Sequence, residues 1–265
     1  MSGNTLSVAG IQLWYAERGS GQPVVMVHGN TGSSRWFERV MDLPGCRTIA
    51  LDLPNFGRSA PLPGEVSIDA YADKVAAFIA AMRIQRPVLV AHSLGGAVAI
   101  SLAVRNPILL RGLVLVDSAA PSGLFTPEDR YPLIESMRTS RDILSAALSA
   151  VVPTLEDPKL FQALVDDALL MAAPAWAGNA RALGAFDYRR RCAAFREPVL
   201  VLWGRKDVIV SEAMARETVQ AFPNARLEIL EHVGHSVVVE DPSRFAALVW
   251  QFISGMASKL AKEGI

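Results

Sequence analysis

The segment from Pro87 to Arg105, PVLVAHSLGGAVAISLAVR, limits the fold of this chain more than any other. A short β-branched run at Val88–Val90 leads into small and polar residues, and an alanine-rich run with helical spacing follows. This order predicts a strand, a sharp turn and a helix, with Ser93 at the turn. Small residues at positions 91, 95 and 96 let the strand and the helix approach closely. A serine hydroxyl held at this turn stands clear of both elements.

The residues around Ser93 follow the pattern G-x-S-x-G, in which the serine is a nucleophile, with Ala91 in place of the first glycine. The replacement is a mild departure, because the position needs a small side chain more than it needs the dihedral freedom of glycine. The other interpretation of the motif is a turn whose serine only caps the following helix. Catalysis by Ser93 requires a general base and an orienting acid elsewhere in the chain.

Composition limits the class of protein. The chain has 265 residues, 51% apolar and 20% charged, so it can bury a sizeable core as one large α/β domain or two small ones. Lys plus Arg number 26, as do Asp plus Glu, and the longest run of like charge is Arg189–Arg191. This balance argues against nucleic acid or an anionic membrane surface as a partner.

Sequence features also indicate a compartment. The N-terminal segment contains charged side chains and no continuous apolar run, so it does not resemble a secretory signal. The apolar window at 88–104 contains a histidine, serines and glycines and is short for a membrane span, which favours a buried strand and helix. Cys46 and Cys192 lie far apart, without metal-ligand spacing. Two free thiols are typical of a reducing compartment, so we expect a cytoplasmic protein.

Strand and helix patterns alternate along most of the chain. This rhythm predicts an α/β fold with a mostly parallel sheet flanked by helices, and ligands at the carboxyl ends of the strands. Ser67 is the expected N-cap of a helix over 68–82, and Ser254-Gly255 should end the last helix. An edge hairpin is predicted around Ala9-Gly10, further strands at 23–27, 47–53, 112–117, 199–203 and 226–230, and further helices at 211–222 and 242–253.

The rhythm breaks between 119 and 195. This span has helical patterns at 141–151 and 158–170, separated by prolines, and no convincing strand. We interpret it as a helical insertion after the sixth strand. The predicted organisation is a core made of residues 1–121 and 193–265, with residues 122–192 as the insertion.

Two histidines follow the last predicted strand, in the sequence EHVGHS at 231–236. A serine hydroxyl is a weak nucleophile at neutral pH and needs a general base, whose tautomer a third group fixes. His235 follows the flexible Gly234 and is the better candidate for this base. The His-x-x-His spacing of His232 and His235 also occurs in metal sites, but no third ligand cluster accompanies it.

Aspartates at the ends of predicted strands are candidates for the orienting acid. Asp207 gives the chain order Ser93, Asp207, His235, which is typical of this serine motif, and Asp117 is the runner-up. Asp52 also ends a strand, but we expect it to organise the loop at 55–59.

A glycine-rich segment, HGNTG at 28–32, follows another predicted strand. Glycines at the carboxyl end of a strand let backbone N–H groups face an open space, as an oxyanion site requires. A plain turn has the same composition, so both interpretations remain.

Five segments in order resemble the α/β-hydrolase fold superfamily, and the resemblance covers almost the full length of the chain. They are HGNTG at 28–32, DLPNFGRS at 52–59, AHSLGG at 91–96, WGRKD at 203–207 and GHSVVVEDP at 234–242. The resemblance implies Ser93 as nucleophile, Asp207 as acid and His235 as base, and the backbone N–H groups of Asn30 and Leu94 as the oxyanion hole. The insertion resembles the cap of this superfamily, which usually shapes the acyl or alcohol pocket. No metal or organic cofactor is expected.

The activity that we expect is hydrolysis of carboxylic esters of small, largely apolar substrates through an acyl-enzyme. Acyl-homoserine lactonases and carbon–carbon bond hydrolases of this fold also use serine and are the alternatives. A non-enzymatic alternative is a hydrolase fold that serves as a ligand receptor. The expected partner is a small-molecule ester, and the sequence makes no prediction of the oligomeric state.

The HGN segment together with SSRWF at 33–37 also resembles the halide-binding loop of haloalkane dehalogenases. Those enzymes use an aspartate at the nucleophile position, so Ser93 argues against dehalogenation. The side chain of Asn30 is either a donor to the pocket or a turn residue. Six large apolar side chains are candidates to line the pocket or to pack elsewhere: Trp36, Phe56, Phe125, Met171, Trp176 and Phe186.

Overall fold

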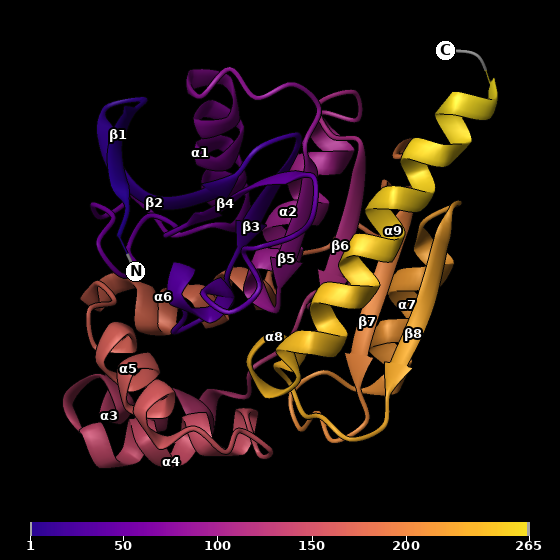
Figure 1. Cartoon of the computed structure of the whole chain (residues 1–265). Helices are drawn as coiled ribbons and strands as arrows, with labels where there is room; N and C mark the ends of the chain where they lie inside the picture. Colours follow the sequence, from indigo (N-terminus) through magenta and orange to yellow (C-terminus); the bar gives the residue numbers. More distant parts are fainter. Residues whose placement is uncertain (1, 264–265) are drawn as a thin grey trace.

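The computed structural model describes residues 2–263, with side chains as far as residue 256, and contains one eight-stranded sheet (Figure 1). The strand order is β1-β2-β4-β3-β5-β6-β7-β8. β2 pairs antiparallel with β1 and with β4, and all other neighbours pair parallel. The predicted mostly parallel sheet and edge hairpin are therefore confirmed. The strands are β1 (Asn4–Val8), β2 (Ile11–Gly19), β3 (Gln22–Val27), β4 (Cys46–Leu51), β5 (Val88–His92), β6 (Gly112–Val116), β7 (Val199–Gly204) and β8 (Ala225–Leu230).

Helices cover the sheet and fill the segment between β6 and β7. Ser67 is the N-cap of the first, as predicted, and its Oγ accepts a hydrogen bond from Ala70 N–H at 3.1 Å. The α-helices of the described residues are α1 (Ile68–Ala81), α2 (Leu94–Arg105), α3 (Tyr131–Thr139), α4 (Arg141–Val151), α5 (Pro158–Ala168), α6 (Ala173–Gly184), α7 (Glu212–Ala221), α8 (Val237–Glu240) and α9 (Pro242–Glu263). Short 3-10 helices are η1 (Ser34–Phe37), η2 (Glu128–Arg130) and η3 (Cys192–Ala194).

The central strands are hydrophobic on both faces. Every residue of β5 and β6 is buried, as expected for parallel strands that helices cover on both sides. α2 packs against these two strands and against α1. α9 runs along the sheet (Figure 1) and packs at Gly112 in β6, where an added Cβ would lie 3.0 Å from Sδ of Met256.

The prediction that the last helix ends at Ser254-Gly255 is wrong, because α9 continues to Glu263. Gly255 does not adopt the left-handed backbone that ends many helices. A helical glycine costs about 1 kcal/mol relative to alanine, but good helix formers, Met, Ala, Lys and Leu, follow it in the sequence. One unfavourable residue among favourable neighbours does not end the helix.

The segment between β6 and β7 contains α3, α4, α5 and α6, which lie beyond the carboxyl ends of the parallel strands (Figure 1). The sequence patterns predict α4 and α5, although α5 ends two residues before the expected position. They miss α3 and α6, whose first turns contain Pro132 and Pro174. Proline fits the first turn of a helix, because its fixed φ is helical and its missing N–H is not needed there. Three prolines of this segment, Pro132, Pro158 and Pro174, thus stand in the first turns of helices.

Within the part of the chain that the structure describes, one bent pair of helices is a candidate membrane span by length and composition. Among the described residues, no single helix combines the length and the apolar composition that a span needs. α5 and α6 reach these criteria only when taken together, and they meet at a bend of 95°.

Candidate active site

Ser93 occupies a strained turn between β5 and α2. Its backbone has φ 53° and ψ −116°, a left-handed conformation that is rare for residues other than glycine. An added Cβ on Gly95 would lie 2.5 Å from the carbonyl oxygen of His28, and one on Gly96 would overlap the side chain of Ser118. Glycine is thus required at 95 and 96, whereas Ala91 fits within the buried strand. The Ser93 side chain makes no capping hydrogen bond, so the capping interpretation is wrong.

Ser93, His235 and Asp207 form one chain of hydrogen bonds. The hydroxyl of Ser93 lies 2.8 Å from Nε2 of His235. Nδ1 of the same ring lies 2.8 Å from Oδ2 of Asp207, which as a carboxylate can only accept, so Nδ1 carries the proton. Nε2 is therefore left as the acceptor of the Ser93 proton. This is the tautomer that a general base beside a serine requires.

The environment of His235 favours its charged form. Burial alone disfavours the imidazolium, but the hydrogen bond and negative charge of Asp207 outweigh it, and the pKa of His235 is raised above its ordinary value. The backbone of His235 is fixed as well. Its N–H donates to the carbonyl of Val151 in α4 at 3.2 Å, and its carbonyl accepts a hydrogen bond from Nε2–H of His92 at 2.7 Å.

His92 itself stays neutral. Burial, with a smaller contribution from the nearby His235, lowers its pKa to about 3. Its Nε2 carries a proton because the His235 carbonyl can only accept. His92 therefore supports the loop of the base and does not compete for the proton of Ser93.

The two candidate acids lie in different places. Oδ1 of Asp207 accepts hydrogen bonds from Ile209 N–H at 2.7 Å and Val210 N–H at 2.9 Å, which leaves Oδ2 for the imidazole. Asp117 instead accepts from the N–H of Gly204 at 2.8 Å and has no hydrogen bond to His235. Burial raises the pKa of Asp117 to about 8. Of the two aspartates, Asp207 is the one that the structure brings to the imidazole.

The backbone N–H groups of Asn30 and Leu94 are free to serve a ligand. Leu94 begins α2, where the first N–H groups of a helix have no partner within it. Neither N–H donates to another described residue. The segment that carries Asn30 is held by His28, whose Nε2 accepts from Leu53 N–H at 3.0 Å.

Asp52 organises the two loops beside this site. One of its oxygens accepts from Ser34 N–H at 2.6 Å and the other from Arg58 N–H at 2.9 Å. The side chain of Ser59 donates to its carbonyl at 2.6 Å. The prediction that Asp52 organises the loop at 55–59 is confirmed.

A cavity of about 230 Å³ opens at Ser93 and His235. None of the residues that line it is an aspartate, glutamate, lysine or arginine. They are Asn30, Thr31, Trp36, His92, Ser93, Leu124, Thr126, Ile134, Met137, Leu144, Ala147, Leu148, Val151, Ala180, Leu183, Ile209 and His235. The lining is therefore largely apolar, with polar groups concentrated near the serine.

Of the six large side chains considered from the sequence, Trp36 lines this cavity and the other five do not. Phe56 and Trp176 pack in the core, and Phe125 is 77% exposed. Four of the lining residues that the sequence analysis missed lie on one face of α4: Leu144, Ala147, Leu148 and Val151. Their spacing of three and four residues is the signal that could have identified this face.

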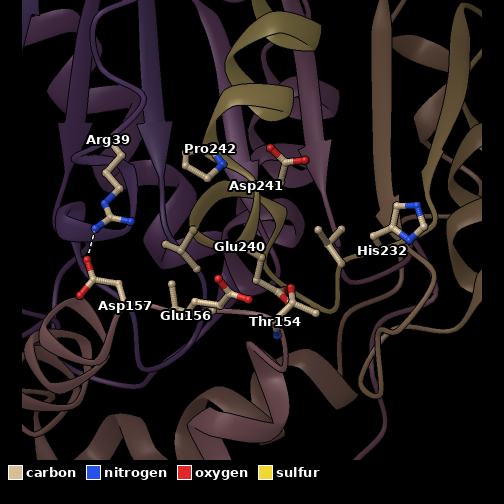
Figure 2. Close-up of a pocket in the computed structure, with 11 residues that line it drawn as sticks. Arg39, Thr154, Glu156, Asp157, His232, Glu240, Asp241 and Pro242 are labelled. Carbon is tan, nitrogen blue, oxygen red and sulfur yellow. Dashed lines mark hydrogen bonds and ion pairs between the residues drawn. The ribbon is translucent and has the colours of Figure 1, made fainter.

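A second, larger cavity of about 500 Å³ lies apart from Ser93 and His235 and is more polar (Figure 2). Arg39 and Asp157 form an ion pair at one side, and His232 lies at the other. His232 therefore faces this cavity, whereas both ring nitrogens of His235 are engaged by Ser93 and Asp207. The two histidines do not act as a pair.

The fold and the site define a class: a hydrolase in which a serine on a strained strand-to-helix turn meets a histidine and a carboxylate at the carboxyl edge of a parallel sheet. The sequence profile described as the Alpha/beta hydrolase family matches residues 24–248. The chain belongs to this family, and the resemblance inferred from its five segments is confirmed.

Relatives within the family differ in activity. The chain is 29% identical over 272 residues to a 2-hydroxymuconate semialdehyde hydrolase of Pseudomonas sp. (strain CF600), covering 95% of this chain and 94% of that protein. An esterase from Exiguobacterium antarcticum superimposes with a TM-score of 0.86 at 22% identity, covering 96% of this chain and all of the other. An enol-lactonase from Burkholderia xenovorans LB400 has the same TM-score and identity, with 95% and 100% covered. At this identity the two structures establish the fold, not the substrate.

Proposed function

We propose that this protein is a serine hydrolase that cleaves carboxylic esters of small, uncharged, largely apolar substrates. The observation that carries the proposal is the hydrogen-bonded series Ser93, His235 and Asp207 beside a cavity whose lining contains no aspartate, glutamate, lysine or arginine. In this proposal Ser93 is the nucleophile, His235 the base and Asp207 the acid that orients it.

Acylation follows from the geometry. His235 takes the Ser93 proton as Oγ attacks the ester carbonyl, and the imidazolium is stabilised by Asp207. The negative charge on the carbonyl oxygen is held by the N–H groups of Asn30 and Leu94, and donors of this kind are each worth about 3 kcal/mol in comparable sites. His235 then gives its proton to the leaving alcohol, and the acyl group remains on Ser93.

Deacylation repeats these steps with water. His235 takes a proton from the water as its oxygen attacks the acyl-enzyme, and the collapse of the second oxyanion returns the proton to Ser93. The acid leaves and the resting enzyme is restored. Every proton in the cycle is carried by His235, so this mechanism requires no cofactor.

The cavity supports the substrate class. Its volume of about 230 Å³ is below the ~300 Å³ at which pockets for drug-sized ligands begin, which favours a short acyl chain. A carboxylate placed there would lose its hydration without gaining a lysine or arginine partner among the lining residues. Muconate-derived substrates carry such a carboxylate, so the lining favours a neutral ester over carbon–carbon bond hydrolysis of that type.

A lactone is an ester closed into a ring, and the same residues would open it by the same steps. We therefore keep lactone hydrolysis as the second candidate. We also propose that residues 122–192, which supply most of the apolar lining, act as the cap. Cys46 and Cys192 are buried and unpaired, which supports the expected cytoplasmic setting.

Labelling by a fluorophosphonate tests the proposal first. The wild-type protein should become labelled at Ser93, and Ser93→Ala should not. A hydrolase fold used only as a receptor leaves the wild type unlabelled.

Substrate panels then separate the candidates. Hydrolysis should be fastest for para-nitrophenyl acetate and butyrate and should fall for the octanoate. A lactone panel with no ester turnover would favour the second candidate. Turnover only of carboxylate-bearing diketones would overturn the ester assignment.

A further inference from the structure

A series of buried polar side chains leads from the core to the cavity at Ser93. It runs from Asn55 through Tyr71 to Asn179 in α6 and ends at Asn30. Asn179 and Tyr71 are fully buried, and Asn55 is 3% exposed. Asn30 and Asn179 are separated by 149 positions in the sequence, so no local pattern relates them.

In each hydrogen bond of the series, the donor and the acceptor are determined by one backbone N–H group, which lies at the core end of the series beside Asn55. Leu62 N–H can only donate, and it meets Oδ1 of Asn55 at 2.8 Å. Asn55 therefore turns its Nδ2 to the hydroxyl of Tyr71, at 2.9 Å. The hydroxyl has a single proton, which it donates to Oδ1 of Asn179 at 2.8 Å.

The same direction continues to Asn30. With its oxygen used by Tyr71, Asn179 presents Nδ2 to Oδ1 of Asn30 at 2.8 Å. Burial raises the pKa of Tyr71 to about 12, so the proton on which the direction depends stays in place throughout the neutral range. Each amide in the series thus has one orientation and not two.

The series sets the orientation of the Asn30 side-chain amide at the cavity. Because Oδ1 of Asn30 is occupied, its Nδ2 is the side-chain atom left for a ligand, and no described residue accepts a hydrogen bond from it. Asn30 lines the cavity together with Ser93. The series therefore delivers N–H donors, and not a carbonyl, to the place where an ester would bind.

We propose that the side-chain amide of Asn30 binds an oxygen acceptor of the substrate and that Asn179 is the positioning residue that fixes this donor. The inference rests on the proposed ester hydrolysis, because it assigns the polar group of that substrate a partner beyond the backbone N–H groups. It also makes a residue of the helical insertion part of the selection for oxygen-containing ligands.

Two Asn→Asp substitutions test the direction of the hydrogen bond between Asn179 and Asn30. Asn30→Asp keeps the acceptor of the Asn179 hydrogen bond but removes the donor to the ligand. Asn179→Asp, when ionised, can only accept, so Asn30 must turn its Nδ2 away from the cavity and toward residue 179. When protonated, the new carboxylic acid donates to Asn30 and restores the original direction. Asn4→Asp, the same change on the exposed edge strand β1, is the control.

Binding is measured in the Ser93→Ala background, where no reaction occurs, with a methyl ketone and its isostere in which C=CH₂ replaces C=O. The ketone should bind about 10- to 100-fold more weakly in Asn30→Asp than in the background protein, as expected for the loss of one buried hydrogen bond. Asn179→Asp should show the same loss at high pH and recover as the pH falls. The alkene should bind all variants alike, which reports an intact cavity.

Unchanged ketone binding in both variants would overturn the proposal. Where a variant does not fold, the assigned Asn30 side-chain amide resonance of the Ser93→Ala protein gives the answer: it should shift with the ketone and not with the alkene. Equal or absent shifts also overturn it. Neither ligand is hydrolysed, so these binding measurements are independent of catalysis. Failure in the fluorophosphonate and ester assays would overturn the proposed ester hydrolysis but would not decide whether Asn30 binds an oxygen acceptor.

Discussion

Glu240 holds the loop of His235 from both sides. Its carboxylate accepts hydrogen bonds from the N–H of Gly234 and the N–H of Ser236, each at 3.0 Å, which are the residues directly before and after the histidine. The same carboxylate accepts from the side chain of Thr154, between α4 and α5, at 2.6 Å. One acidic side chain thus joins the base loop to the helical insertion.

Replacing Glu240 by alanine should lower kcat by about 10- to 100-fold with a smaller change in KM, because a displacement of the base of about 1 Å has that effect on a reaction that depends on alignment. Steady-state ester hydrolysis measures it. Thr154→Val, which removes only the hydroxyl that faces Glu240, is the matched control and should change kcat by no more than about threefold. Equal kcat values for Glu240→Ala and the wild type would contradict the positioning role.

Asp207→Asn should lower kcat by about 10³- to 10⁴-fold, because an amide no longer fixes the tautomer of His235. Asp117→Asn should change kcat by less than about tenfold, since Asp117 contacts Gly204 and not the imidazole. Burst kinetics with a para-nitrophenyl ester measures both variants. A larger loss in Asp117→Asn would move the acid role to that residue.

These two aspartates also mark the limit of the sequence analysis. Asp117 and Asp207 both follow strands of the parallel sheet, and β6 and β7 are neighbours in it. Asp117 lies directly after its strand with φ 44° and turns to Gly204 N–H, whereas Asp207 lies in a turn whose N–H groups hold its other oxygen. Motif order favours Asp207, but only the loop conformations show which carboxylate reaches His235.

The strands whose side chains are buried on both faces could be predicted from the sequence. β5 and β6 read as β-branched and apolar runs because both faces of these strands are covered, and Gly95 and Gly96 mark the turn because a side chain there would collide with the backbone or with Ser118. Contacts such as Asn179 to Asn30 or Glu240 to Thr154 have no such signature. They join single polar residues that lie far apart in the sequence, and no periodicity relates them.

The acid limb of the pH profile should report His235. Because its pKa is raised, the imidazole becomes protonated, and inactive as a base, at a pH above the ordinary value near 6.5. kcat/KM should therefore rise with pH through a midpoint above about 6.5. His92 does not contribute, since its pKa of about 3 keeps it neutral over this range. A kcat/KM midpoint at or below the ordinary histidine pKa would show that Asp207 raises the pKa of His235 less than burial lowers it.

Asp117 should make the stability of the folded protein fall as pH rises. Its pKa is about 8 when folded and near 3.8 when unfolded, so between these values the native state keeps a proton that the unfolded state releases. Stability from this group is therefore complete below the unfolded pKa and decreases by up to about 1.4 kcal/mol per pH unit above it, until the folded carboxyl also ionises.

Asp117→Asn carries no such proton and keeps an oxygen for Gly204 N–H. The free energy of unfolding is measured in urea at several pH values. The value for the variant minus the value for the wild type should increase by about 1 kcal/mol per pH unit between about pH 5 and pH 7. Asp129→Asn, at an exposed position on η2, should follow the wild type at every pH. If the free energies of unfolding of the wild type and Asp117→Asn change with pH in the same way, Asp117 is ionised in the folded state and its burial does not raise its pKa.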